Sequence, residues 1–197
     1  MPQTVRKSYT ARVVIKKKLY NHIMKAIFFD RDGTLIDEPS DDAVSTWEEY
    51  IERPDLDSLR QLTDAGYLIF IITNQDAIAD GRLTQEFYEA TNTRLLASLQ
   101  AAGVPIEGIY TCPHTESDGC TCIKPKRGLI DQAITGCDID LSNSFVVGDR
   151  TTDVLLGQAV GAKTIFLQTS RHTLEEGVVP TYACDTLSLA VEKILQP

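Results

Sequence analysis

Residues 26–35 read AIFFDRDGTL: four apolar side chains lead directly into two carboxylates, a glycine and a threonine. The apolar run has the length and composition of a buried β-strand. Asp30 and Asp32 are alternate residues leaving that strand, so both can face one site, and Gly33 permits the tight turn that follows. Two carboxylates this close need a shared proton or a cation, so the segment predicts a Mg²⁺ site. The alternative is a solvated Asp-Gly turn after an edge strand.

Outward from this segment, short apolar runs alternate with stretches of helical periodicity. Strands are expected at residues 26–29, 68–73, 108–111, 145–148 and 164–167. Helices are expected over the leucines at 56, 59 and 62, over a face formed by positions 88, 91, 95 and 99, and near 128–135, 151–160 and 186–195. Such alternation is typical of βαβ units. The sequence therefore predicts an α/β fold, a Rossmann-like three-layer sandwich with a central parallel sheet.

Length and composition indicate the class of protein. A chain of 197 residues suits one well-buried domain, and 43% hydrophobic residues is ordinary for a soluble globular protein. No apolar run approaches the roughly 18 residues that cross a bilayer, so no membrane association is expected. Five cysteines without a hydrophobic signal segment indicate a reducing, cytoplasmic location. We expect a monomer or a weak dimer.

The charge is distributed unevenly along the chain. The net charge is −9, yet the first 29 residues contain seven basic side chains and no acidic one, which leaves twelve basic residues against 28 acidic ones. A body this acidic repels nucleic acid and membrane surfaces. The expected partner is therefore a small substrate whose anionic end meets a metal and a few local cations.

Residues 1–23 are basic and free of acidic side chains, and they end just before the first predicted strand. We interpret them as a poorly ordered N-terminal extension, with the domain spanning residues 24–197. A transit peptide has a similar composition, and a third interpretation is an extra strand at Arg12–Ile15.

Polar groups also follow two other predicted strands. Thr73, Asn74 and Gln75 offer a hydroxyl and two amides that suit phosphoryl oxygens, although such residues also cap helices. Asp149 adds a carboxylate, with Arg150 beside it. Because open parallel sheets bind ligands at the carboxyl ends of their strands, these side chains are expected around one site. Lys124 supplies a cation that could neutralise a phosphate and a nucleophile together, or could be an ordinary surface lysine.

Four metal-binding side chains lie close together in residues 112–122: Cys112, His114, Cys120 and Cys122. Three thiolates and an imidazole are ligands that Zn²⁺ takes tetrahedrally, and four protein ligands leave no open position for chemistry. The spacing differs from that of common zinc fingers, and a plain loop with reduced thiols is the alternative. A structural zinc two residues before Lys124 would fix the direction of that lysine.

Four segments resemble, in order, the motifs of the haloacid dehalogenase superfamily: FFDRDGTL at 28–35, IITN at 71–74, the lysine of IKPK at 123–126, and VVGDRTTD at 146–153. The resemblance covers residues 25–167 and implies Mg²⁺-dependent phosphomonoester hydrolysis through an aspartyl phosphate. It implies Asp30 as nucleophile and Asp32 as general acid and then base. It also implies that Thr73 and Lys124 hold the phosphoryl group, and that Mg²⁺ binds Asp30, the main-chain carbonyl of Asp32, and Asp149.

The zinc loop CPHTESDGCTCIKP resembles that of one branch of the superfamily, which contains histidinol-phosphate phosphatases and D-glycero-D-manno-heptose 1,7-bisphosphate 7-phosphatases. This implies a structural Zn²⁺ and one of those phosphoesters as substrate, with Asn74 and Arg150 as candidate substrate-binding residues. Ile123 stands where both kinds usually carry an arginine, so a substrate-facing cation is missing; candidates to compensate are Arg82, Lys126, Arg127 and Arg150. The spacing between motifs leaves no room for a large cap domain.

Two other functions compete with a small-metabolite phosphatase. Open-site members of the superfamily include nucleic-acid end (3′-) phosphatases, and the basic N-terminal segment could contact phosphates, but the acidic body argues against this function. A catalytically silent, zinc-stabilised interaction domain is the second. Binding alone would not require the complete set of candidate catalytic residues: Asp30, Asp32, Thr73, Lys124 and Asp149.

Overall fold

The computed structural model describes residues 12–14, 23–169 and 171–196. At its centre lies a seven-stranded sheet with the strand order β1-β4-β3-β2-β5-β6-β7. The strands are β1 (Arg12–Val14), β2 (Lys25–Phe29), β3 (Tyr67–Asn74), β4 (Gly108–Cys112), β5 (Phe145–Gly148), β6 (Lys163–Leu167) and β7 (Tyr182–Cys184). Strands β2 to β7 are parallel, and β1 is antiparallel to β4. The predicted parallel sheet is confirmed.

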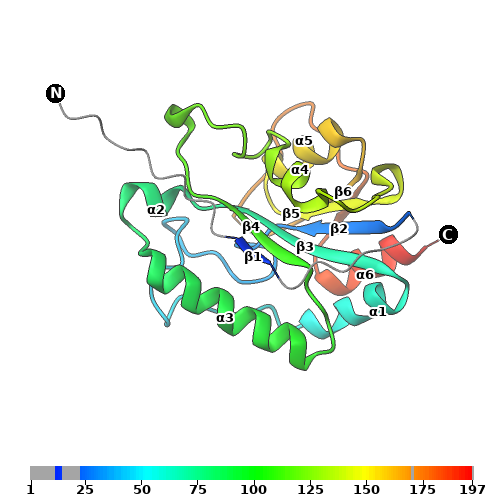
Figure 1. Ribbon diagram of the computed structural model, residues 1–197, viewed down its shortest axis with the longest axis horizontal. Coiled ribbons are helices and arrows are strands. Elements are labelled where there is room, and N and C mark those ends of the chain that lie inside the picture. Colours follow the sequence, from blue (N-terminus) through cyan, green and yellow to red (C-terminus); the bar gives the residue numbers. More distant parts are fainter. Residues whose placement is uncertain (1–11, 15–22, 170, 197) are drawn as a thin grey trace.

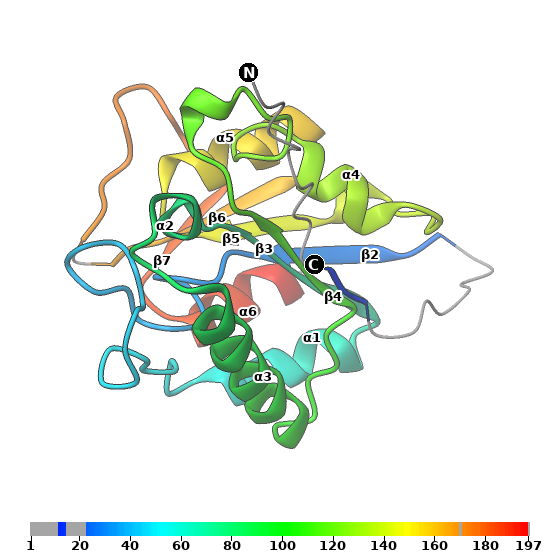
Figure 2. The same ribbon diagram turned by 60° about the vertical axis from the view of Figure 1, so that its left-hand side comes forward.

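Helices cover both faces of this sheet, which makes the three predicted layers (Figure 1 and Figure 2). One face carries α4 (Gly128–Ile134) and α5 (Thr151–Val160). The other carries α1 (Arg60–Asp64), α3 (Gln85–Ala101) and α6 (Leu187–Leu195). A short helix, α2 (Asp76–Asp80), follows β3, and 3₁₀ turns lie at Leu56–Leu59, Glu116–Asp118 and Leu141–Asn143.

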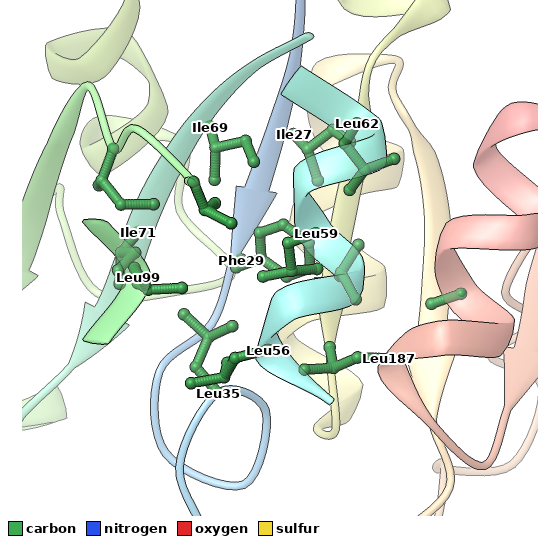
Figure 3. Close-up of a cluster of buried hydrophobic side chains, with 14 of the residues drawn as sticks. Ile27, Phe29, Leu35, Leu56, Leu59, Leu62, Ile69, Ile71, Leu99 and Leu187 are labelled. Carbon is green, nitrogen blue, oxygen red and sulfur yellow. The ribbon is translucent and has the colours of Figure 1, made fainter. Parts of the chain in front are cut away.

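The two-residue period of the strands divides the core into two parts. In β2, Ile27 and Phe29 face the layer of α1, α3 and α6, whereas Ala26 and Phe28 belong to the cluster under α4 and α5. All four side chains are fully buried. The three leucines of the first predicted helix lie over β2 and β3 in Figure 3: Leu56, Leu59 and Leu62.

Strands β1 and β7 and the helix α2 are short elements that the main sequence-based assignment does not contain. Strand β7 was not predicted, because three residues carry too little pattern to be recognised. Strand β1 agrees with the third interpretation of the N-terminal segment, since Arg12–Val14 extends the sheet at the β4 edge. Residues 1–11 and 15–22 lie outside the described residues, so the domain boundary at residue 24 stays a prediction.

The strand order creates a crevice beside β2. The chain leaves β2 for β3 and β4 on one side and later returns to β5 and β6 on the other. Ligands bind at such switch points, outside the carboxyl ends of the strands. Among the described residues, loops, 3₁₀ turns and the helices α1, α2 and α3 connect β2, β3 and β4, which agrees with the predicted absence of a large cap domain. No helix in the described part of the chain is long and apolar enough to cross a membrane.

Leu59→Ala should lower the free energy of unfolding by about 2–5 kcal/mol, because removing this fully buried side chain leaves a cavity over the sheet. Leu189→Ala on α6 is the matched control, since its side chain is 40% exposed, and it should change stability by less than about 1 kcal/mol. Urea unfolding followed by circular dichroism measures both variants. Equal effects would contradict the assignment of this layer as the principal core.

Candidate active site

A pocket of about 470 Å³ opens at the carboxyl ends of the central strands. Six residues predicted from the sequence line it: Asp30, Asp32, Thr73, Asn74, Lys124 and Arg150. Asp149 joins them from β5, because its carboxylate and those of Asp30 and Asp153 offer oxygens within 4.8 Å of one another. The structure thus brings four segments that are distant in sequence to one place.

Lys124 is buried between two carboxylates. Its Nζ lies 2.8 Å from Asp30 Oδ1 and 2.7 Å from Asp153 Oδ1. Burial by itself lowers the pKa of the ammonium, but Asp153 and Asp30 outweigh burial and raise the pKa of Lys124 above its ordinary value. Lys124 is therefore a fixed cation, in contact with the carboxylate that is the predicted nucleophile.

The end of β3 holds the main chain around Lys124. The Lys124 amide donates to Asn74 Oδ1 at 2.9 Å, and Asn74 Nδ2 donates to the Lys124 carbonyl at 3.4 Å. Asn74 was predicted to bind substrate. It lines the pocket, but its side-chain amide is used largely to fix the loop that carries the cation.

Asp32 is held by two neighbouring side chains. Arg31 Nη1 lies 2.8 Å from Asp32 Oδ1, and Gln75 Nε2 donates to Asp32 Oδ2. Burial is the largest influence on the carboxyl group, and it raises the pKa of Asp32 against the opposing effects of Arg31 and Gln75. A raised pKa suits a carboxyl group that must carry a proton to a leaving group.

Asp149 carries the least compensated charge of the site. It is fully buried and its Oδ2 has no hydrogen-bond partner. Burial, followed by the charges of Asp30 and Asp153, raises the pKa of Asp149 to about 8. Gly33 (φ +77°) passes so close that a Cβ there would lie 2.2 Å from Asp149 Oδ2. A buried carboxylate oxygen without a partner, beside further carboxylates, fits a divalent cation that prefers oxygen ligands, so these residues fit the predicted Mg²⁺.

The four predicted zinc ligands come together at the end of β4 and in the loop that follows. Cys112 Sγ lies 3.0 Å from Cys122 Sγ and 3.6 Å from Cys120 Sγ, and His114 Nδ1 lies 3.2 Å from Cys122 Sγ. Burial raises the pKa of the Cys112 thiol, so its thiolate form needs a nearby cation. Three sulfurs and one nitrogen within 4.8 Å of one another fit a tetrahedral Zn²⁺.

Ion pairs join two loops at the mouth of the pocket. Arg150 Nη2 lies 2.7 Å from Glu38 Oε1, and His172 Nε2 lies 2.6 Å from Glu38 Oε2. Arg171 Nη2 lies 2.9 Å from Asp42 Oδ1. These contacts tie the loop that follows the first motif to Arg150 after β5 and to the segment that follows β6. Arg150, predicted to bind substrate, is thus already paired with a carboxylate.

Sequence reasoning assigned no catalytic or binding role to several residues that shape the site: Arg31, Glu38, Asp153, Arg171 and His172. Gln75 was expected to bind phosphoryl oxygens, whereas its side-chain amide donates to Asp32 and Thr73. A usable signal existed for Asp153, which lies one helical turn after Asp149 in the fourth motif. No pattern marks His172, because it reaches the pocket only through the fold.

The chain is similar to known phosphatases. A family model described as HAD-hydrolase-like matches residues 121–190. The chain is 38% identical over 161 residues to D-glycero-β-D-manno-heptose-1,7-bisphosphate 7-phosphatase of Pasteurella multocida, covering 78% of this chain and 86% of that one. It is 34% identical over 141 residues to the histidine biosynthesis bifunctional protein HisB of Campylobacter jejuni, covering 71% of this chain and 40% of HisB.

Among solved structures, the D,D-heptose 1,7-bisphosphate phosphatase of B. bronchiseptica, complexed with magnesium and phosphate, matches with a TM-score of 0.76 and 29% identity. The match covers 88% of this chain and 99% of that one. The chain therefore spans less than half of HisB but almost the whole of this heptose bisphosphate phosphatase.

We expect Asp149→Asn to stabilise the metal-free protein at about pH 9, by up to about 6 kcal/mol. The carboxyl group ionises near pH 3.8 in the unfolded chain but near pH 8 in the folded one, so the folded state loses stability as the pH rises between those values. An amide has no charge to bury and removes this loss. Urea unfolding with a chelator, at about pH 5 and about pH 9, measures the difference.

Asp153→Asn is the matched control, because Asp153 is equally buried but paired with Lys124. Removing it leaves a buried ammonium with one partner fewer and should cost about 3–5 kcal/mol. If Asp149→Asn were destabilising at alkaline pH, Asp149 would not be the uncompensated charge.

Proposed function

Because the chain belongs to the haloacid dehalogenase-like hydrolase family, we propose that it is a Mg²⁺-dependent phosphatase that acts on a small phosphorylated metabolite through an aspartyl phosphate at Asp30. One observation carries this proposal: Asp30, Asp32 and Lys124 converge on one pocket beside the buried, uncompensated Asp149. We also propose, as predictions, a cytoplasmic location and a monomer or weak dimer.

Asp30 and Asp32 divide the chemistry between them. In the first step a carboxylate oxygen of Asp30 attacks phosphorus, the bond to the leaving oxygen breaks, and Asp32 gives that oxygen its proton. In the second step Asp32 takes a proton from a water molecule whose oxygen attacks phosphorus. The bond between phosphorus and Asp30 then breaks and inorganic phosphate leaves.

Lys124 and Thr73 hold the transferred group. Lys124 Nζ already contacts Asp30, so the same ammonium can neutralise nucleophile and phosphoryl oxygens together. The Thr73 hydroxyl is buried at the end of β3 and lines the pocket. Mg²⁺ held by Asp30, Asp149 and the main-chain carbonyl of Asp32 would supply Lewis-acid stabilisation of the charge on the phosphoryl oxygens.

The charge of the pocket lining indicates which kind of phosphorylated substrate it accepts. Seven carboxylates line it, from Asp30, Asp32, Glu38, Asp42, Asp76, Glu116 and Glu175, against three lysine or arginine side chains, Arg82, Lys124 and Arg150, and the imidazole of His172. Each of these bases already pairs with a carboxylate, and the lining residue Ile123 is apolar. Such a wall favours a substrate whose far end is neutral or cationic, as in histidinol phosphate. Similarity over 78% of this chain to a heptose 1,7-bisphosphate phosphatase favours heptose 1,7-bisphosphate, which stays the second candidate.

Phosphate release with Mg²⁺ tests the function. The panel holds histidinol phosphate, D-glycero-D-manno-heptose 1,7-bisphosphate and a 3′-phosphorylated oligonucleotide. We expect one small ester to dominate, with kcat/KM above about 10⁴ M⁻¹s⁻¹. Asp30→Asn is the control, and it should lower kcat at least about 10³-fold without changing the circular dichroism spectrum. Near-normal turnover by this variant would exclude the covalent mechanism, and preference for the oligonucleotide would exclude a small metabolite.

We further propose that Cys112, His114, Cys120 and Cys122 bind one structural Zn²⁺. The site lies two residues before Lys124, so the metal would fix the loop that aims the ammonium at Asp30. Elemental analysis of protein purified without chelators should find about one zinc per chain. Cys122→Ser should lose that zinc and lower the unfolding temperature, whereas Cys137→Ser, outside the cluster, should retain it. Absence of zinc from the unmodified protein would exclude the site.

A further inference from the structure

We propose that Gln75 is a positioning residue that aligns the general acid Asp32 and the phosphate-binding hydroxyl of Thr73 with each other. The inference rests on the proposed function, because it assigns how one proton reaches the leaving group. Gln75 is 5% exposed and follows β3 directly, where its main-chain amide donates to the Cys112 carbonyl at 2.7 Å. Its backbone is therefore fixed by the sheet.

The side-chain amide of Gln75 makes two contacts. Nε2 donates one hydrogen to Asp32 Oδ2 and the other to Thr73 Oγ1 at 2.9 Å. Both amide hydrogens are thereby used. Because Thr73 Oγ1 accepts from Gln75, its own hydrogen is directed elsewhere, and its protein acceptor, the Asn74 carbonyl, lies at the long distance of 3.3 Å. That hydroxyl hydrogen can turn to a phosphoryl oxygen.

Arg31 is the second side chain that holds Asp32 in place. Its Nη1 lies 2.8 Å from Asp32 Oδ1 and 3.1 Å from Oδ2, while Nη2 donates to Thr91 Oγ1 at 2.6 Å. The guanidinium also lies over the ring of Tyr88, 5.0 Å from its centroid. Arg31 is 1% exposed and its guanidinium is hydrogen-bonded to Thr91 on α3, so its position is fixed. The carboxyl group of Asp32 is therefore held by two side chains, Gln75 and Arg31.

The contacts distinguish the two oxygens of Asp32. A carboxylate offers about two acceptor positions on each oxygen. Oδ2 accepts from both Gln75 and Arg31, whereas Oδ1 accepts from Arg31 alone. The free position is therefore on Oδ1, in a residue that lines the pocket. As the phosphorus–oxygen bond breaks, the O–H bond at Oδ1 breaks too, and its proton goes to the electron pair of the leaving oxygen.

Loss of this alignment should depend on the leaving group. A basic leaving oxygen needs the proton, whereas an acidic phenol departs without it. Phenyl phosphate and 4-nitrophenyl phosphate make a matched pair, because they have similar shape and differ chiefly in the acidity of the phenol. A variant that only loosened the fold or weakened phosphate binding would slow both esters alike.

The test measures kcat and KM of Gln75→Met on both esters. We expect kcat for phenyl phosphate to fall about 10²-fold and that for 4-nitrophenyl phosphate by less than about 5-fold. In an Asp32→Asn background, Gln75→Met should add almost nothing, because the group it positions is gone. Gln75→Leu gives a second variant should the first not fold, with circular dichroism as the check.

Arg53→Lys is the matched control. Arg53 Nη2 donates to the Gly33 carbonyl at 2.8 Å, so it touches the same turn without touching Asp32. This variant should affect both esters by the same factor. Equal losses on the two esters in Gln75→Met, or a full loss on top of Asp32→Asn, would overturn the inference. Wild-type protein that releases phosphate from none of the esters would instead refute the proposed function, and the inference with it.

Discussion

Three buried carboxylates share one buried ammonium group, and this imbalance governs the site. Lys124 pairs with Asp30 and Asp153, which leaves Asp149 without a lysine or arginine partner and its Oδ2 without a hydrogen bond, 3.9 Å from His172 Nε2. Burying an unpaired charge in a protein costs free energy, and binding a proton or a cation to the carboxylate lowers that cost. The raised pKa of Asp149 is the first response, and a divalent cation is the second. A metal-dependent phosphatase requires the second response, because developing charge on a phosphoryl group needs a cation in the same place.

The fold supplies this concentration of charge by aligning strand ends. Parallel neighbours β3, β2 and β5 end side by side, and each continues directly into polar residues. Gly33 lets the first of these turns pass against Asp149, where any side chain would collide with the carboxylate. The ammonium comes from a loop and not from a strand end, so it needs separate anchors. Asn74 holds its main chain, and the proposed zinc cluster begins at Cys112 on the neighbouring strand.

Local patterns predicted much of this arrangement, and contacts between distant segments account for the rest. Strand β2 and the carboxylates after it follow from the order of apolar and polar residues in one short segment. The cysteine and histidine cluster proposed to bind zinc follows from the chemistry and spacing of its side chains. The burial of Arg31 is a feature that local sequence patterns do not predict. An arginine between two aspartates is expected at the surface, yet it is buried because Thr91 and Tyr88 on α3 receive it some sixty positions later. No periodicity in either segment encodes that meeting.

The balance of charge at the mouth of the pocket differs from that at its floor. At the floor, negative charge exceeds positive charge and a cation is needed. At the mouth, Glu38 and Asp42 are balanced by Arg150 and Arg171. A balanced set of ion pairs exerts little net attraction on a second phosphate, because each guanidinium would have to exchange an existing carboxylate for it. The floor therefore determines that a phosphoryl group binds, whereas the mouth selects by shape and by which ion pairs a substrate can replace. Ile123, which is apolar, lines the pocket and directly precedes Lys124, strengthens that selection against a second anion.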